Sequence, residues 1–178
     1  MSPTASGPVC VLVGSPGAGK TTVGALLAEA LGVALRDTDA VIEDRAGKTI
    51  PEIFIDDGES RFRDLERTAV AECLVTWPGV LALGGGAVLA EENRAALRGH
   101  TVVYLSVELA DAVARIGLGQ GRPLLTMSPR ATLKHLLERR RPLYEQVATV
   151  TVATDGRTPH EVAAEVLRAL AAGRETPQ

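Results

Sequence analysis

Aromatic side chains are scarce in this sequence of 178 residues: they make up 3% of it, whereas hydrophobic residues as a whole make up 46%. The core therefore has to be built from Ala, Val and Leu. Cysteine is rarer still: Cys10 and Cys73 are the two present, and their spacing matches no metal-ligand pair. Isolated cysteines of this kind indicate reduced thiols in a cytoplasmic core and exclude a disulfide framework.

The sequence also has no excess of basic residues and no long apolar run. Its 19 Lys and Arg against 22 Asp and Glu give a net charge of −3, which argues against a nucleic-acid partner. No stretch approaches the roughly 18 apolar residues of a membrane span. Residues 1–8 contain no basic segment followed by an apolar run, so we expect no signal peptide. These absences predict a cytoplasmic protein with no membrane contact.

Short apolar runs alternate with segments of helical periodicity. The runs predict five strands, at 9–13, 33–36, 80–83, 102–105 and 148–152. Helices are expected over 20–31, 91–98, 108–116 and 130–147, and over most of 40–76 with breaks near Gly47 and at 56–58. A last helix follows the capping-box pattern Thr158-Pro159-His160-Glu161. This alternation predicts one α/β domain over 1–178, with its core at about 9–172 and a parallel sheet covered by helices on both faces.

Residues 14–21 match the phosphate-binding pattern G-x-x-x-x-G-K-[ST] at every fixed position. Glycines let consecutive backbone N–H groups turn toward one anion, and the helix that begins at Lys20 adds its positive end. The Lys20 ammonium is expected to reach the β- and γ-phosphates and the Thr21 hydroxyl to bind Mg²⁺. Since the motif follows a predicted strand and opens a predicted helix, it predicts a nucleoside-triphosphate site.

The acidic partner of the magnesium ion is expected after the second strand. The third and fourth strands end in Gly84 and Ser106, whereas the second is followed by Asp37-Thr38-Asp39. If this segment is extended, Asp37 and Asp39 face one side, at the rim where the P-loop lies. One could then serve the metal and the other accept a proton from a substrate hydroxyl. The alternative is a polar loop in which Asp39 is the N-cap of the next helix.

A regulatory GTPase-type switch is the main alternative from another functional class. Such a switch needs an Asn-Lys-x-Asp motif, which this sequence lacks, and its one D-x-x-G match, at 44–47, falls inside a predicted helix. A kinase for another small molecule, such as gluconate or a nucleoside monophosphate, also remains open.

Two arginines are expected to face inward. Arg140 lies seven positions after Leu133, on the apolar face of the predicted helix 130–147. Arg63 lies in another helical stretch, and Glu66 three positions later could hold it. Two convergent guanidinium groups suit a carboxylate, whereas the alternative is two solvated helix arginines.

Two glycine-rich segments complete the pattern. The triplet at 84–86 ends a strand at the same rim, which indicates close approach of a ligand to the backbone, although a flexible turn is the alternative. Residues 117–129 predict a mobile lid that brings Arg122 onto the transferred phosphate, although a disordered connector is the alternative.

Together these motifs resemble the shikimate kinase family over about residues 9–170. The matching segments are Gly17-Ala18-Gly19-Lys20-Thr21, Asp37-Thr38-Asp39, Phe62-Arg63-Asp64-Leu65-Glu66, Gly84-Gly85-Gly86, Arg122-Pro123-Leu124-Leu125 and Arg140-Arg141-Pro142-Leu143-Tyr144. The resemblance implies ATP-dependent phosphorylation of the 3-hydroxyl of shikimate, in aromatic amino-acid biosynthesis. It also implies a three-layer P-loop kinase fold with parallel strands ordered 2-3-1-4-5. We expect a monomer.

The resemblance also assigns residues to roles. The catalytic group is Lys20, Asp37, Asp39 and Arg122. ATP is expected to contact Gly17, Ala18, Gly19, Lys20, Thr21, Thr22, Arg115, Arg122 and Arg157. Shikimate is expected in the region 38–66 and beyond it, against Asp39, Phe54, Phe62, Arg63, Glu66, Gly84, Gly85, Gly86 and Arg140, with Pro16 as a further wall. Mg²⁺ is expected at Thr21 and, through water, at Asp37.

Overall fold

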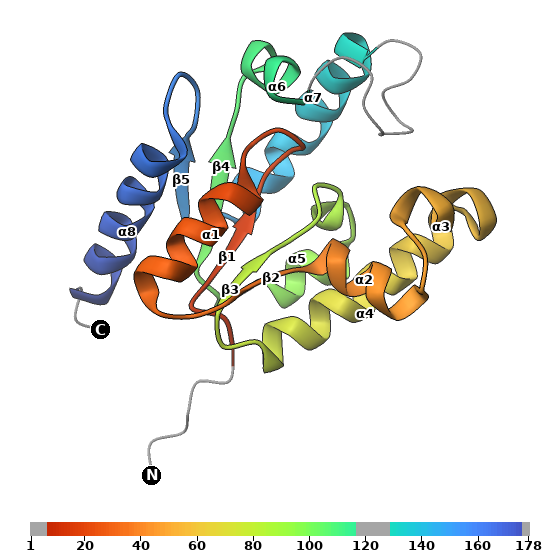
Figure 1. The fold of residues 1–178 in the computed structure, drawn as a ribbon, viewed down its shortest axis with the longest axis horizontal. Helices are drawn as coiled ribbons and strands as arrows, with labels where there is room; N and C mark the ends of the chain where they lie inside the picture. The colour runs from red at the N-terminus through yellow and green to blue at the C-terminus, as the bar shows by residue number, and fades with distance from the viewer. Residues whose placement is uncertain (1–6, 117–128, 176–178) are drawn as a thin grey trace.

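The computed structural model describes residues 7–116 and 129–175, and its centre is a five-stranded parallel sheet (Figure 1). The strand order is β2-β3-β1-β4-β5, which confirms the predicted fold class. The strands are β1 (Cys10–Val13), β2 (Leu35–Asp37), β3 (Val80–Ala82), β4 (Val102–Ser106) and β5 (Val150–Ala153). The central strand β1 lies between β3 and β4, with Leu12 opposite Ala82 on one side and Val103 on the other.

Helices cover both faces of this sheet. They are α1 (Lys20–Leu31), α2 (Thr38–Ala46), α3 (Ile50–Asp56), α4 (Gly58–Thr76), α5 (Glu91–Ala96), α6 (Leu109–Ile116), α7 (Pro129–Val147) and α8 (Pro159–Glu175), with a short 3-10 helix, η1 (Ala87–Leu89). Helices α1 and α8 pack together on one face, whereas α4 and α5 lie on the other (Figure 1). Because both faces are covered, the inner strands β1 and β3 are apolar and buried along their whole length instead of alternating.

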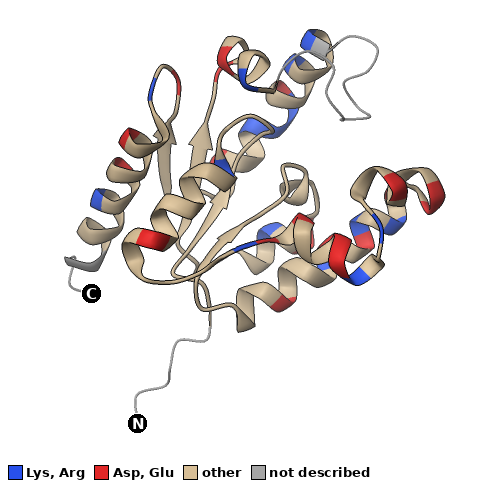
Figure 2. Cartoon of the chain, viewed as in Figure 1, with Lys and Arg blue, Asp and Glu red and all other residues tan. Residues whose placement is uncertain are grey.

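The sheet separates two aliphatic cores, as the alternation of side chains along a strand requires. Leu12 of β1 packs with Leu27 of α1 and Val166 of α8, whereas its neighbours Val11 and Val13 pack with the α4 side. Figure 2 shows the charged residues mostly on the helices, and β2 is the one described strand that contains any. No helix in the described part of the chain is long and apolar enough to cross a bilayer.

Helices α2, α3 and α4 form a smaller cluster beside the main sheet (Figure 1). Its core contains Ile42, Ile53 and Phe62, all nearly inaccessible to solvent. Helix α3 begins with a complete capping box, in which the Thr49 side chain accepts from the Glu52 N–H and the Glu52 carboxylate accepts from the Thr49 N–H. This signal is local in the sequence. The cluster forms one wall of the candidate site.

The expectation that one extended segment contains both Asp37 and Asp39 is wrong. Strand β2 runs from Leu35 to Asp37, and α2 already begins at Thr38, so Asp39 lies in the first turn of a helix. The alternative, with Asp39 as N-cap, is also wrong, since Asp37 is the N-cap and its Oδ1 accepts from the Asp39 N–H at 2.8 Å. A capping carboxylate satisfies a backbone donor that would otherwise have no partner, and this favours a helix over an extended segment.

Helix α7 continues through Pro142 to Val147, so this proline does not end the helix. Proline removes one backbone donor, but Tyr144 beyond it is 1% exposed and packs in the core, which keeps the helix in place. The orientation predicted for this helix is confirmed, because Arg140 is buried and Arg139 is exposed. The start of α8 is also confirmed, with Thr158 Oγ1 accepting from the Glu161 N–H.

Candidate active site

The P-loop connects the end of β1 to the first residue of α1. Gly17 and Gly19 have φ values of 83° and 91°, a region that favours glycine, so the loop can turn its N–H groups inward. The Lys20 ammonium donates to the carbonyl oxygens of Gly14 at 2.6 Å and Ser15 at 3.1 Å. The lysine is thereby held over the loop, where it can meet a phosphate.

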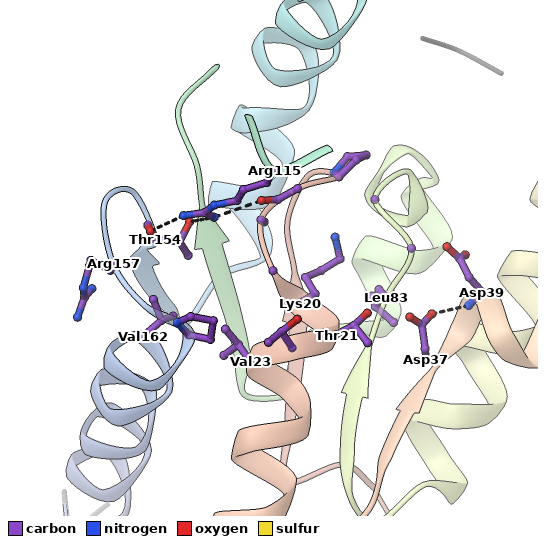
Figure 3. Close-up of a pocket in the computed structure, with 18 residues that line it drawn as sticks. Lys20, Thr21, Val23, Asp37, Asp39, Leu83, Arg115, Thr154, Arg157 and Val162 are labelled. Carbon is purple, nitrogen blue, oxygen red and sulfur yellow. Dashed lines mark hydrogen bonds between the residues drawn. The ribbon is translucent and has the colours of Figure 1, made fainter. Parts of the chain in front are cut away.

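A cavity of about 490 Å³ opens beside the P-loop (Figure 3). All the predicted nucleotide-binding residues that the structure describes line it, namely Gly17, Ala18, Gly19, Lys20, Thr21, Thr22, Arg115 and Arg157. Asp37 and Asp39 line the same cavity from the end of β2 and the start of α2. Arg122 and residues 117–128 of the predicted lid lie outside the described residues.

Arg115 joins three elements at the top of this cavity in Figure 3. Its guanidinium donates to the Gly17 carbonyl of the P-loop at 3.2 Å and to Thr154, at the end of β5, through the hydroxyl at 2.9 Å and the carbonyl at 2.6 Å. Arg157 lies near the amino end of α8, where it donates to the Ala153 carbonyl and pairs with Glu165. Both arginines therefore border the cavity at the end away from Asp37 (Figure 3).

A second cavity of about 160 Å³ adjoins the first. The two share four lining residues, Pro16, Asp39, Gly84 and Gly85, so ligands in the two cavities would meet there. The second cavity is lined by every residue predicted for shikimate: Asp39, Phe54, Phe62, Arg63, Glu66, Gly84, Gly85, Gly86 and Arg140. Much of the remaining wall is apolar and includes Ile50, Pro51, Leu133 and Leu136. An apolar pocket with a few charged groups is typical of small-molecule sites.

Arg140 is buried and Arg63 is largely withdrawn from solvent, so the alternative of solvated helix arginines is wrong. The Arg63 guanidinium, with 16% of its side chain exposed, donates to Glu66 Oε1 at 2.8 Å. Arg140 is 5% exposed, and its Nε has no hydrogen-bond partner among the described residues. Burial raises the pKa of Glu66, against the opposing charges of Arg63 and Arg140. A buried guanidinium without full compensation is costly and favours an anionic ligand.

Asp39 has the electrostatic properties of a proton acceptor. Burial, followed by the nearby Asp37 carboxylate, raises its pKa from 3.8 to about 6, while Lys20 opposes the shift. Its Oδ1 is buried and has no hydrogen-bond partner among the described residues. A carboxylate with a pKa closer to neutrality is a better general base, and an oxygen without a partner can accept from a substrate hydroxyl.

The glycines at 84–86 are required for space and not for backbone conformation, because none of them has a positive φ. A Cβ on Gly84 would lie 2.4 Å from Asp39 Oδ1, and one on Gly86 would lie 2.5 Å from an Arg63 terminal nitrogen. At Gly85 a Cβ would meet Pro16 at 3.0 Å. The loop therefore lets charged side chains from α2 and α4 approach the backbone directly.

Two residues hold this loop that the sequence pattern does not single out for a role. The Thr38 hydroxyl accepts from the Gly84 N–H at 3.1 Å, and the Tyr144 hydroxyl donates to the Gly85 carbonyl at 2.6 Å. In the sequence, the one sign that Tyr144 lies near the site is its spacing: it follows Arg140 by four residues on a predicted helix, so the two share a face. Both contacts join residues more than forty positions apart, so local patterns do not reveal them.

The oxygen donors near the P-loop fit a magnesium ion. The hydroxyl of Thr21 and the carboxylates of Asp37 and Asp39 line one cavity. The part of the chain that the structure describes contains no group of three or more His, Cys, Asp or Glu side chains able to hold a metal alone. Mg²⁺ is commonly bound by one or two protein oxygens together with waters and substrate phosphates. These features define a P-loop kinase that phosphorylates a small anionic metabolite.

Comparison with known proteins identifies the family. The family model for shikimate kinase matches residues 16–171. A shikimate kinase of Salinispora arenicola (strain CNS-205) is 70% identical over 165 residues, which is 93% of this chain and 99% of the relative. A solved shikimate kinase of Acinetobacter baumannii, in complex with shikimate, is 37% identical with a TM-score of 0.91 and 97% of each chain covered. The chain therefore belongs to the shikimate kinase family.

A gluconokinase from Sinorhizobium meliloti 1021 is a more distant structural neighbour, with a TM-score of 0.59 and 23% identity. That likeness concerns the fold alone. The family match speaks against the two alternatives that the sequence left open, a gluconate or nucleoside-monophosphate kinase and a regulatory nucleotide-binding switch.

Proposed function

We propose that this chain transfers the γ-phosphoryl group of ATP to the 3-hydroxyl of shikimate, with ATP in the larger cavity and shikimate in the smaller one. The observation that carries this arrangement is the position of Asp39, which lines both cavities. The P-loop residues line the larger cavity with Asp39, and Arg63 and Arg140 line the smaller one. An acceptor hydroxyl held at Asp39 would thus face the terminal phosphate.

The smaller cavity suits a hydroxylated ring that carries a carboxylate. Arg63 and Arg140 are the cations expected to receive the carboxylate, each as a planar fork. Phe54 and Phe62, whose ring centroids are 4.9 Å apart, contribute flat apolar surface for the ring. Glu66 would keep the Arg63 guanidinium oriented through their 2.8 Å hydrogen bond.

The larger cavity suits a nucleotide bound through its phosphates. The backbone N–H groups of residues 17–22 and the Lys20 ammonium would hold the β- and γ-phosphates. Thr21 and, through water, Asp37 would hold Mg²⁺, which neutralises developing phosphate charge. Arg115 would border the base, and Arg122, outside the described residues, is proposed to contact the transferred phosphate.

Asp39 is proposed to orient the 3-hydroxyl and to accept its proton as the new bond to phosphorus forms. With a pKa of about 6, the carboxylate is mostly ionised at neutral pH and still more basic than an ordinary aspartate. A loose transition state also requires the hydroxyl to be held in line with the γ-phosphate. Asp39 would therefore both position the hydroxyl and accept its proton.

A coupled ADP-release assay tests the assignment. Shikimate should support turnover, and gluconate and nucleoside monophosphates should not; ADP release that is independent of shikimate, or absent altogether, would overturn it. Arg140→Ala should raise the KM for shikimate about 30-fold or more, because a charged hydrogen-bonding group is lost, and leave the KM for ATP nearly unchanged. Arg139→Ala is the matched control, since Arg139 is exposed. Equal effects on both substrates would exclude Arg140 from the shikimate site.

Asp39→Asn separates chemistry from binding. We expect kcat to collapse by about 10²-fold or more, as is common when a general base is removed, while ATP affinity measured by calorimetry is retained. Retained turnover would remove Asp39 from the reaction.

We also propose that the chain acts as a cytoplasmic monomer. The support for a monomer is that residues of a single chain line both cavities. Sedimentation velocity tests the monomer, and cell fractionation tests the compartment.

A further inference from the structure

Tyr144 is buried on α7 and faces the glycine loop from behind the candidate shikimate site. It is 1% exposed, and its hydroxyl donates to the Gly85 carbonyl at 2.6 Å. Its ring stacks on Tyr104 of β4, with centroids 5.1 Å apart and planes inclined by 24°. The ring thus packs in the core while the hydroxyl reaches a loop that lines the cavity.

The loop at 84–86 depends on such contacts for its shape. Three consecutive glycines have no side chains to restrict their backbone, and glycine loses more conformational freedom on ordering than any other residue. Gly84 is held by Thr38 and by the Ala87 N–H, and the Gly86 carbonyl accepts from the Leu89 N–H. Between these points, Tyr144 holds the Gly85 carbonyl. This contact connects the loop to α7, whereas the carbonyls of Gly84 and Gly86 bind N–H groups only three residues further along the chain.

The direction of the Gly85 carbonyl determines the direction of another group. No cis peptide occurs among the described residues, so the Gly86 N–H points opposite to the Gly85 carbonyl in the same peptide plane. Gly85 and Gly86 also lie against the arginines: a Cβ at Gly85 would lie 3.5 Å from Arg140 Nη1, and one at Gly86 2.5 Å from Arg63 Nη1. A change in the tilt of this peptide would therefore move a backbone donor relative to both guanidinium groups.

Arg140 and Tyr144 are four residues apart on α7, so they lie on the same side of the helix. Arg140 reaches the cavity, and Tyr144, one turn later, binds the loop that forms part of the cavity wall. The Tyr144 hydrogen bond therefore sets the distance between the helix that supplies one arginine and the loop opposite it.

We propose that Tyr144 is a positioning residue for the acceptor substrate: its hydroxyl fixes the Gly85–Gly86 peptide relative to Arg140, so that the loop and the arginine receive the shikimate carboxylate and ring together. This proposal rests on the proposed placement of shikimate in the smaller cavity. Tyr144 is not among the residues that line the smaller cavity, so it acts through its neighbours: through Gly85, and through the Arg140 side chain, with which its hydroxyl also interacts.

The protonation state of Tyr144 supports this role across the working range of pH. Burial raises the pKa of Tyr144 to about 12, although the nearby Arg140 opposes the shift. The hydroxyl thus remains a donor at neutral and mildly alkaline pH. The contribution of this hydrogen bond to shikimate binding should accordingly not change between about pH 6.5 and 9.

Tyr144→Phe removes the donor and keeps the ring in its stack. We expect the affinity for shikimate, measured by isothermal titration calorimetry without nucleotide, to fall about tenfold, which corresponds to about 1.4 kcal/mol. The affinity for ATP should stay within about twofold of the wild-type value. Tyr104→Phe is the matched control, because it removes a hydroxyl from the same stacked pair without touching Gly85. Thermal unfolding of each variant shows whether it is folded.

Three results would overturn the proposal: Tyr144→Phe with wild-type affinity for shikimate, an equal loss of ATP affinity, or an equal loss of shikimate affinity in Tyr104→Phe. The wild-type protein and Arg140→Ala test separately whether shikimate binds in the smaller cavity. If the wild type does not bind shikimate, or Arg140→Ala binds it normally, the placement fails and the role of Tyr144 falls with it. If both behave as expected and Tyr144→Phe is unchanged, the positioning role alone is wrong.

Discussion

Ionised Asp39 should make the folded protein less stable at neutral pH than it would be with a neutral side chain there. Its pKa rises from 3.8 to about 6, mainly because the carboxylate is buried and secondly because Asp37 is close. One pKa unit corresponds to about 1.4 kcal/mol, so this rise represents about 3 kcal/mol of folding stability. That is a substantial share of the stability of an ordinary domain, about 5–15 kcal/mol.

The sign of the effect follows from proton binding in the two states. The unfolded chain releases the Asp39 proton near pH 3.8, whereas the folded chain retains it up to about pH 6. Between these values the folded state binds more protons, so the contribution of Asp39 to stability decreases as the pH rises. The destabilisation is complete above about pH 6 and absent below the unfolded value.

Asp39→Asn removes this penalty, since asparagine has nearly the same shape and no charge. We expect the variant to be more stable than the wild type by about 2–3 kcal/mol at about pH 8, with almost no difference near pH 4. Urea unfolding at several pH values measures the difference in free energy of unfolding. In thermal unfolding it should appear as an increase in Tm of about 5–10 °C at about pH 8. The same variant should be nearly inactive.

Asp44→Asn is the matched control, because Asp44 lies on the same helix and is exposed. It removes the same charge from the chain and should change stability little at any pH. The reasoning would be refuted if Asp39→Asn were no more stable than the wild type at pH 8, or if its advantage were the same at pH 4 and pH 8.

Three further predictions concern activity. The kcat/KM for shikimate should fall about tenfold per pH unit below about pH 6, because Asp39 then becomes protonated and cannot accept the hydroxyl proton. Gly86→Ala should lower the affinity for shikimate at least about tenfold and leave the affinity for ATP unchanged, since the new Cβ would lie 2.5 Å from Arg63 Nη1 and displace that side chain; calorimetry measures both affinities. Arg115→Ala should raise the KM for ATP about tenfold in steady-state assays and leave that for shikimate unchanged, since its bonds to Gly17 and Thr154 are lost.

Each of these predictions has a control or a contrary outcome. A rate that stays level from pH 7 to pH 5 would separate Asp39 from the rate-determining proton transfer. Gly173→Ala adds a methyl group at a helical glycine that has nothing within 4 Å of its Cβ, and it should leave both affinities unchanged. Arg98→Ala removes an exposed arginine and should leave both KM values unchanged. An altered shikimate affinity in Arg115→Ala would contradict its place in the nucleotide site.

Much of the fold could be predicted because its signals are local. The P-loop, the strand before it and the helix after it are contiguous, and the need to bind phosphate through backbone N–H groups specifies their residues directly. The apolar runs near Val11, Val80 and Val103 are strands because both faces of the sheet are covered, and Arg140 faces inward because of helical spacing from Leu133. Element boundaries were less accurate, since capping bonds such as that of Asp37 decide them.

The sequence by itself determined the chemical groups of the site: a lysine and hydroxyl at a phosphate loop, two carboxylates after the second strand, two arginines and three glycines. Only the tertiary structure decided how they act together. Asp39 has its raised pKa because packing removes its carboxylate from water, and the glycines at 84–86 are needed because side chains from α2 and α4 approach there. Tyr144 matters because α7 brings its hydroxyl to Gly85, across 59 positions of the chain. Such properties arise from the distances between remote segments, and a linear pattern does not contain those distances.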